Sequence, residues 1–174
     1  YNISTGAVSS IGTVVDFSEP LSEAVYHIIA FDGNIYCSGT YTSIGGVSIT
    51  GVGKYTISGG TWSSIGGGGT AGALAASNDY LYALIGSNVK MWDGATWTIL
   101  GTAPSLIVCL TAYGTNLLAG TLSGDHIYIW DGSAWDTFGG GVSGAVYSIA
   151  ILVEDVYVGG AFTDAGNYIA KYVN

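Results

Sequence analysis

Short apolar runs separated by tight turns recur along the chain at intervals of about 40 residues. Four segments share one pattern, in which an apolar run, a short turn and a second apolar run follow each other; they are residues 24–36, 70–82, 106–118 and 145–157. Short runs rich in β-branched and aromatic residues and bounded by turn residues predict β-hairpins. A unit of about 40 residues built from short strands is typical of the blades of a β-propeller.

Each hairpin is followed by an outer pair of predicted strands. In three units a strand ends on an aromatic residue, a turn follows and the next strand contains a tryptophan; these segments are residues 54–62, 91–97 and 129–135. Asp-Gly occupies the turn in the second and third segments, and it favours a hairpin because Gly adopts positive φ freely and Asp tolerates it. Glycine-rich stretches at 66–69 and 139–141 then lead to the next unit. We therefore expect four strands in each blade.

The fourth unit ends early, and its missing outer strand is predicted at the other end of the chain. Residues 1–12 align without gaps to residues 55–66 and match at eight of twelve positions. We interpret residues 1–12 as an outer strand displaced by circular permutation, which would close the ring and hide a sheet edge. The closure is expected either within the chain or with a neighbouring chain. The residues assigned to this closure or assembly are Tyr1, Ile3, Val8, Ile11, Ile169 and Tyr172.

The predicted fold is therefore an all-β, four-bladed β-propeller in one domain, with the N-terminal strand completing the last blade. The predicted parts are the outer strand of blade 4 at 1–12, a linker at 13–23, blade 1 at 24–69, blade 2 at 70–104, blade 3 at 105–142 and the rest of blade 4 at 143–174.

Three motifs carry a resemblance to a known repeat. They are Tyr-Val-Gly-Gly-Ala-Phe-Thr-Asp-Ala-Gly at 157–166, Ile-Ala-Lys-Tyr at 169–172 and Trp-Asp-Gly-Ser-Ala-Trp at 130–135. With them the chain resembles the kelch-like propeller repeats of bacterial, phage and fungal surface proteins, of the galactose-oxidase-central-domain kind. The resemblance implies a propeller over nearly the whole chain but no particular chemistry, because propellers host lectins, scaffolds and enzymes alike. The chain departs from the family in having fewer blades and no assignable copper site.

Composition narrows the classes of partner. The chain has three lysines, no arginine and twelve carboxylates, for a net charge of −9. Nucleic-acid binding needs Lys and Arg to neutralise phosphates, so that class is excluded, and anionic membrane surfaces are disfavoured for the same reason. No apolar run reaches the ~18 residues that membrane insertion would need. Low charge with abundant Ser, Thr, Gly and Tyr favours an extracellular protein, either secreted, on a cell surface or on a virion. The chain begins at Tyr1 without Met, as a mature form would.

No residue pattern predicts a catalytic, cofactor or metal site. The two histidines, His27 and His126, occupy different positions of the repeat, whereas a metal site needs several converging ligands. Asp93 and Asp131 occupy the same turn in two blades, so turn geometry explains them, and equivalent positions of separate blades lie too far apart for an acid–base pair. We therefore expect a non-enzymatic protein without cofactors.

The two cysteines, Cys37 and Cys109, fall on different strands of non-adjacent predicted blades. A disulfide requires Cα atoms within about 7 Å. We therefore expect two buried free thiols.

Three tryptophans, Trp62, Trp97 and Trp135, recur at one position of the repeat, and Val8 takes that position in the fourth unit. They could serve as stacking platforms for sugars, or each could pack between neighbouring blades, and we favour packing. Two functions remain open. The first is a module that binds glycan or protein through its loops or faces. The second is a structural subunit that assembles with copies of itself, as a homo-oligomer or filament, by strand exchange or by packing of faces. We place binding ahead of assembly.

Overall fold

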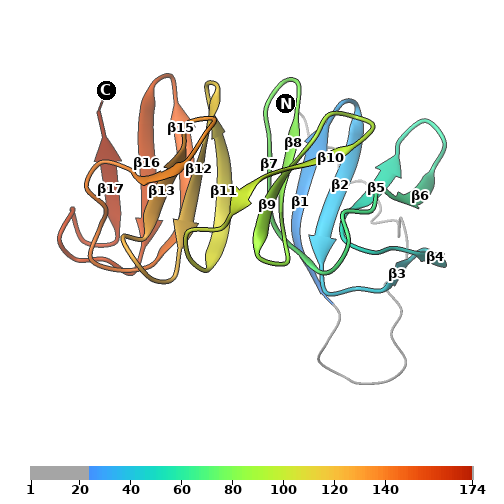
Figure 1. The fold of residues 1–174 in the computed structure, drawn as a ribbon, viewed down its shortest axis with the longest axis horizontal. Coiled ribbons are helices and arrows are strands. Elements are labelled where there is room, and N and C mark those ends of the chain that lie inside the picture. The colour runs from blue at the N-terminus through green and yellow to red at the C-terminus, as the bar shows by residue number, and fades with distance from the viewer. Residues whose placement is uncertain (1–23, 174) are drawn as a thin grey trace, which may run out of the picture.

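The computed structural model describes residues 24–173, and this range is all-β (Figure 1). None of its segments is a helix long and apolar enough to cross a membrane. The predicted linker and closing strand lie outside the described residues, and with them the candidate residues Tyr1, Ile3, Val8 and Ile11.

The strands form four antiparallel sheets in which chain neighbours pair with each other. The first sheet contains β1 (Val25–Phe31), β2 (Asn34–Gly39), β5 (Gly53–Thr56) and β6 (Thr61–Ser64). The second contains β7 (Ala71–Ala76), β8 (Leu81–Ile85), β9 (Asn88–Trp92) and β10 (Trp97–Thr102). The third contains β11 (Ile107–Tyr113), β12 (Asn116–Thr121), β13 (Ile127–Trp130) and β14 (Trp135–Thr137). The fourth contains β15 (Val146–Leu152), β16 (Asp155–Gly160) and β17 (Ile169–Tyr172). A small hairpin of β3 (Ser43–Ile44) and β4 (Val47–Ser48) interrupts the connection from β2 to β5.

The four sheets follow each other in chain order along a row, with the first and the fourth at opposite ends (Figure 1). Neighbouring sheets touch through their first strands: β1 contacts β7, β7 contacts β11, and β11 contacts β15. The predicted all-β fold of small antiparallel sheets is therefore confirmed. Contact between the first and the fourth sheet, which would close four sheets into a ring, is not seen among the described residues.

The core lies between the sheets because successive residues of a strand point to opposite faces, and the inner sheets are apolar on both. Three layers of buried side chains result. Their central residues are Tyr36, Leu74 and Leu81 between the first and second sheets, Tyr82, Leu110 and Leu117 between the second and third, and Leu118, Val146 and Val158 between the third and fourth.

The third and fourth sheets approach each other closely at Gly120. A Cβ atom placed there would lie 2.5 Å from Cys109 Sγ and 2.7 Å from the carbonyl oxygen of Val146 on the fourth sheet. We expect Gly120→Ala to lower the free energy of unfolding by about 1–3 kcal/mol, because overpacking must push the two sheets apart. Urea unfolding measures this change. Gly59→Ala is the control, since its Cβ would meet nothing nearer than Thr61 Oγ1 at 3.4 Å; equal losses in both variants would contradict the prediction.

Candidate functional site

The histidines lie apart from each other. His27 lies on β1, where burial lowers its pKa below the ordinary value. His126 precedes β13, and its Nδ1 atom lies 2.9 Å from the carbonyl oxygen of Val142. Within residues 24–173, no three His, Cys, Asp or Glu side chains come close enough together to hold a metal ion. The two histidines therefore do not belong to a cluster of metal ligands in this range.

The two aspartates of the outer turns accept hydrogen bonds from backbone amides. Asp93 Oδ1 accepts hydrogen bonds from the amide nitrogens of Ala95 at 2.8 Å and Thr96 at 2.7 Å. Asp131 makes the same pair of contacts with the two residues that follow its Gly. These hydrogen bonds stabilise the charged carboxylates and hold the pKa of both groups below the ordinary value. Turn geometry accounts for the two residues, as the sequence indicates.

Both cysteines are free and buried, which confirms the predicted pair of free thiols. Cys37 lies on the first sheet, 3.3 Å from the hydroxyl oxygen of Tyr41, and Cys109 lies on the third sheet. Burial raises the pKa of Cys37 and raises that of Cys109 to about 11. Neither thiol is therefore prepared for nucleophilic chemistry, which requires the thiolate.

Two of the repeated tryptophans lie between sheets. Trp97 packs against the core between the first and second sheets, and its Nε1–H donates to the carbonyl oxygen of Ile65 at 2.9 Å. Its ring contacts that of Trp92, with centroids 5.3 Å apart. Trp135 packs in the same way against the core between the second and third sheets, with its centroid 5.7 Å from that of Trp130. Packing thus accounts for their recurrence, and a role as sugar platforms stays a prediction.

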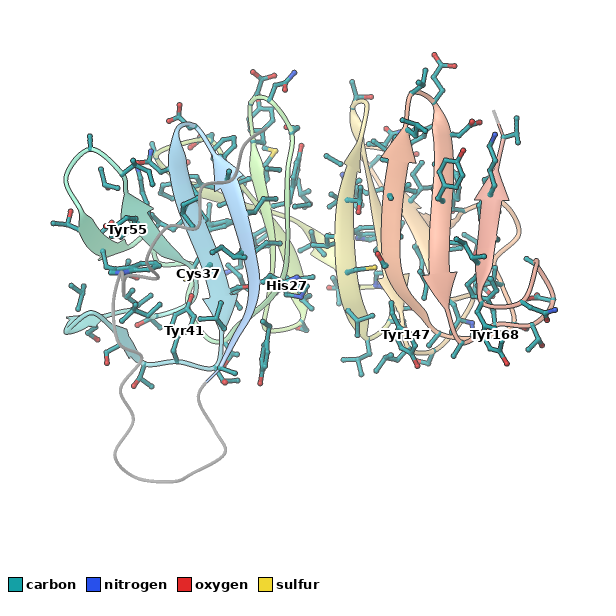
Figure 2. The ribbon with its side chains drawn as sticks, turned by 180° about the vertical axis from the view of Figure 1, so that it is seen from behind. His27, Cys37, Tyr41, Tyr55, Tyr147 and Tyr168 are labelled. Carbon is teal, nitrogen blue, oxygen red and sulfur yellow. The ribbon has the colours of Figure 1, made fainter. Side chains whose placement is uncertain are left out.

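The third tryptophan, Trp62, has the same position in the first sheet, and no sheet of the described range precedes that one. Its ring lies 5.2 Å from that of Tyr55 and packs against a buried cluster around Cys37 and Tyr41. Apart from Cys37 on β2, the buried residues of this cluster come from the connection that carries β3 and β4. Figure 2 shows Cys37, Tyr41 and Tyr55 gathered on the first sheet. The connection therefore covers the outer part of one face of the first sheet. In each later sheet, the preceding sheet covers the corresponding face.

No described strand covers the inner part of that face. We name it the leading end face and define it by Ile28, Ala30 and Ile35, which share one side of the first sheet through the pairs Ile28–Cys37 and Ala30–Ile35. Ile28 is 66% exposed, whereas Leu74, its equivalent in the second sheet, is 6% exposed. A large apolar side chain is thus left in solvent at a position that the neighbouring repeat buries.

The other end of the row carries a second open face. We name it the trailing end face and define it by Ala150, Leu152, Tyr157, Ile169 and Lys171, which strand register places on the side of the fourth sheet turned away from the third. Leu152 is 63% and Ile169 is 64% exposed. Ile169, predicted to belong to the closing strand pair, therefore lies on this open face.

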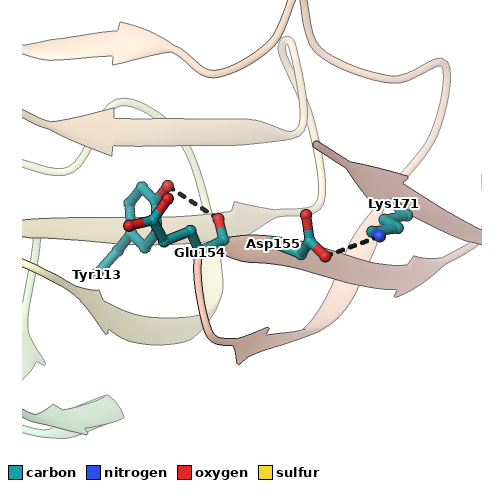
Figure 3. A network of polar contacts seen from close by, with 4 residues as sticks. All are labelled: Tyr113, Glu154, Asp155 and Lys171. Atoms are coloured by element: carbon teal, nitrogen blue, oxygen red, sulfur yellow. Dashed lines mark hydrogen bonds and ion pairs between the residues drawn. The ribbon is translucent and has the colours of Figure 1, made fainter. Parts of the chain in front are cut away.

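The trailing end face contains a cation held between an acid and a ring. Lys171 Nζ lies 2.7 Å from Asp155 Oδ2 (Figure 3). The same atom lies 5.6 Å from the centroid of the Tyr157 ring. The Asp155 carboxylate raises the pKa of Lys171. The first sheet repeats the pair on the corresponding side, where Lys54 Nζ lies 5.8 Å from the centroid of the Tyr36 ring.

The equivalent tyrosines of the first and fourth sheets differ in whether a neighbouring sheet covers them. Tyr36 is 2% exposed because its face packs against the second sheet. Tyr157 has the same place in the fourth sheet, opposite Lys171 in the ladder as Tyr36 is opposite Lys54, but no described sheet covers it. The trailing end face therefore has the residues of a face between sheets without the neighbouring sheet.

An aromatic cavity lies between the third and fourth sheets. It has a volume of about 360 Å³, and Tyr113, Phe138, Tyr172 and Glu154 are among its lining residues. The Tyr113 hydroxyl donates to the carbonyl oxygen of Glu154 at 3.1 Å (Figure 3), which leaves the carboxylate of Glu154 outside this hydrogen bond. Tyr172, predicted to belong to the closing strand pair, donates to the carbonyl oxygen of Gly141 at 3.1 Å. Aromatic faces beside a carboxylate can bind sugars or ammonium groups.

Sequence reasoning missed this cavity and both end faces. The residues around the cavity come from distant segments, and Phe138 follows a short outer strand without any signal of its own. The sequence places Lys54 with Tyr36 and Lys171 with Tyr157 at equivalent positions of two repeats. Only the order of the sheets shows that no described sheet covers the second pair.

Comparison with known proteins supports the propeller-like fold but does not assign the chain to a family. No family model and no curated protein matches the chain. The resemblance to kelch-like repeats therefore stays a prediction.

Solved structures do match. The computationally designed protein Ika4 is 15% identical, with a TM-score of 0.65 over 92% of this chain and 96% of that chain. The extracellular domain of the hybrid two component system BT4673 from B. thetaiotaomicron is 14% identical, with a TM-score of 0.62 over 93% of this chain and 22% of that chain. The BamB propeller from Moraxella catarrhalis is 13% identical, with a TM-score of 0.55 over 87% of this chain and 44% of that chain. The chain thus spans less than half the length of both natural proteins. At these identities the likeness is one of fold, and the fold is propeller-like.

The raised thiol pKa values predict slow alkylation. We expect Cys109, with a pKa of about 11, to react with iodoacetamide at pH 8 far more slowly than a free cysteine, because its thiolate fraction is small and its side chain is buried. Cys37 is expected to be protected in the same way. Mass spectrometry after timed labelling measures both rates, with the chain unfolded in urea as the control. Rapid labelling of the folded chain would contradict the prediction.

Proposed function

We propose that this chain is a non-enzymatic structural module that associates with copies of itself through its two end faces. The observation that carries the proposal is the pair of Lys171 and Tyr157 on the trailing end face, which repeats the pair that the first sheet packs against its neighbour. A face with the composition of an interior layer is stabilised when another sheet covers it. A further copy can supply such a sheet at each end.

The exposed apolar side chains support the same function. Ile28 on one end face and Leu152 and Ile169 on the other are each more than half exposed. Removing such side chains from water stabilises an assembly by about 25 cal/mol for each Å² of apolar surface. An extracellular location is part of the proposal, and the extracellular domain of BT4673 among the structural neighbours supports it.

Completion of the fourth sheet is the finer part of the proposal. This sheet has three described strands where the other three have four, so β17 is an edge strand in the described range. We expect residues 1–12 to pair with β17 of the same chain or of a neighbouring chain, as their alignment to residues 55–66 indicates. Closure of the sheets into a propeller ring belongs to the same proposal.

Glycan binding is the second candidate function, and the aromatic cavity favours it. Tyr113, Phe138 and Tyr172 offer ring faces for stacking, and the Glu154 carboxylate can accept hydrogen bonds from sugar hydroxyl groups. This cavity is a better candidate than the three tryptophans, whose rings pack against the cores beside the sheets.

Self-association is tested with single substitutions on each end face. We expect Ile28→Asp and Leu152→Asp each to weaken association by about 100-fold or more, because an unpaired carboxylate would be buried at the contact. Sedimentation velocity over a concentration series measures the change. Ile99→Asp is the matched control, because Ile99 is 59% exposed on β10 and lies on neither end face. A wild-type chain that stays monomeric at all concentrations, or an equal loss in the control, would refute the proposal.

Glycan binding is tested on an array of extracellular polysaccharide fragments. We expect Phe138→Ala to abolish any binding, because the stacking face between Tyr113 and Tyr172 is lost. Glu154→Gln is expected to weaken binding about tenfold by loss of a charged hydrogen-bond acceptor. Asp79→Asn, a change of an exposed acid outside the cavity, serves as the control. Absence of binding by the wild-type chain would remove this second function.

A further inference from the structure

Every sheet in the row has two different faces. One face is directed toward the preceding sheet and uses one set of repeat positions: Leu74 and Ala83 in the second sheet, Leu110 and Ala119 in the third, and Ile149 and Val158 in the fourth. The other face is directed toward the following sheet through Tyr36, Tyr82 and Leu118. Each described contact between sheets therefore joins two unlike faces.

The two end faces are the two unlike halves of such a contact. The leading end face carries Ile28, at the position of Leu74, Leu110 and Ile149. The trailing end face carries Tyr157, at the position of Tyr36, Tyr82 and Leu118. A leading end face can therefore pack on a trailing end face through the same repeat positions that form the contacts between sheets within the chain.

The connection that covers the outer part of the first sheet is compatible with this contact. Tyr41 lies in that connection four residues after Cys37, and Phe162 lies four residues after Val158 at the same position of the fourth sheet. Phe162 is fully buried in the layer between the third and fourth sheets. An aromatic residue at this position is thus part of a contact between sheets and does not obstruct one.

Contacts between unlike faces produce either a closed ring or an open filament. Within the described residues the row does not close on itself, since its first and fourth sheets lie at its opposite ends (Figure 1). The same row corresponds in fold to 44% of the longer BamB propeller. Two copies of the row therefore supply a chain length close to that of a complete propeller of this kind.

From these observations we infer that the partner of the end faces is a second copy of this chain, and that two copies close one ring. The leading end face of each copy packs on the trailing end face of the other, so the two contacts are identical and related by a two-fold axis. The ring contains eight sheets, four from each copy. The inference rests on the proposed self-association and adds its partner geometry and its stoichiometry.

The contact between the third and fourth sheets supplies the positions for a test. Thr111 Oγ1 lies 3.2 Å from the carbonyl oxygen of Ile149 across that contact. The equivalent residues on the end faces are Ala150 and Ile28. The double variant Ile28→Cys/Ala150→Cys therefore places two thiols next to each other at every contact between copies. Cys37 and Cys109 are buried and stay out of the reaction.

The experiment oxidises the double variant with diamide and analyses it by non-reducing gel electrophoresis and intact mass. The expected product has the mass of two chains joined by two disulfides, with no longer species. Native mass spectrometry of the wild-type chain is expected to show the same stoichiometry without any substitution. Circular dichroism of the variant verifies that it folds.

Each other outcome has a defined meaning. A ladder of longer products would overturn the ring and keep self-association. A disulfide within one chain, or a wild-type chain that is monomeric, would overturn both. Dimers formed by Ala150→Cys alone or Ile28→Cys alone would show that like faces meet, which overturns the ring but keeps self-association. A dimeric wild-type chain whose double variant forms no cross-link would also overturn the ring.

Discussion

The structure depends on one constraint: a sheet whose two faces are both apolar needs a neighbour on each side. The second and third sheets satisfy it within the chain, and their central side chains, such as Leu81 and Leu118, are fully buried. The first and fourth sheets satisfy it on one side each. The connection with β3 and β4 covers part of the first sheet, whereas no segment within residues 24–173 covers the trailing face of the fourth sheet in a comparable way. The proposed association would therefore use the same kind of contact that holds the four sheets together.

Close approach between sheets explains the small residues of the repeat. Gly120 allows β12 to approach the start of β15, and the alanines of β7 lie in the layers on either side of the second sheet. Tryptophan pairs fill the layers at the outer strands, as Trp92 and Trp97 show. Neighbouring sheets thus contact each other through their first strands and carry large aromatic rings at their outer strands.

Much of this arrangement could be predicted from the sequence, because hairpins and turns are local. The Asp-Gly turns at Asp93 and Asp131 and the order of strands in each unit depend only on residues close in the chain. The angle between neighbouring sheets depends on how side chains such as Tyr82 and Leu110 fit across a layer, and a repeat pattern does not contain it. For the same reason the sequence did not show that the ends of the row are open or that three distant aromatic residues form a cavity.

The three lysines of the chain each contact a tyrosine ring or a backbone carbonyl group. Lys54 and Lys171 lie over tyrosine rings, and Lys90 Nζ donates to the carbonyl oxygen of Gly67 at 2.6 Å. With a net charge of −9, the molecule carries a large excess of negative charge. Two such molecules repel each other over distances comparable to the Debye length, which is about 8 Å at physiological ionic strength. Dissolved salt would consequently favour encounter between copies, although the proposed contact between them is largely apolar.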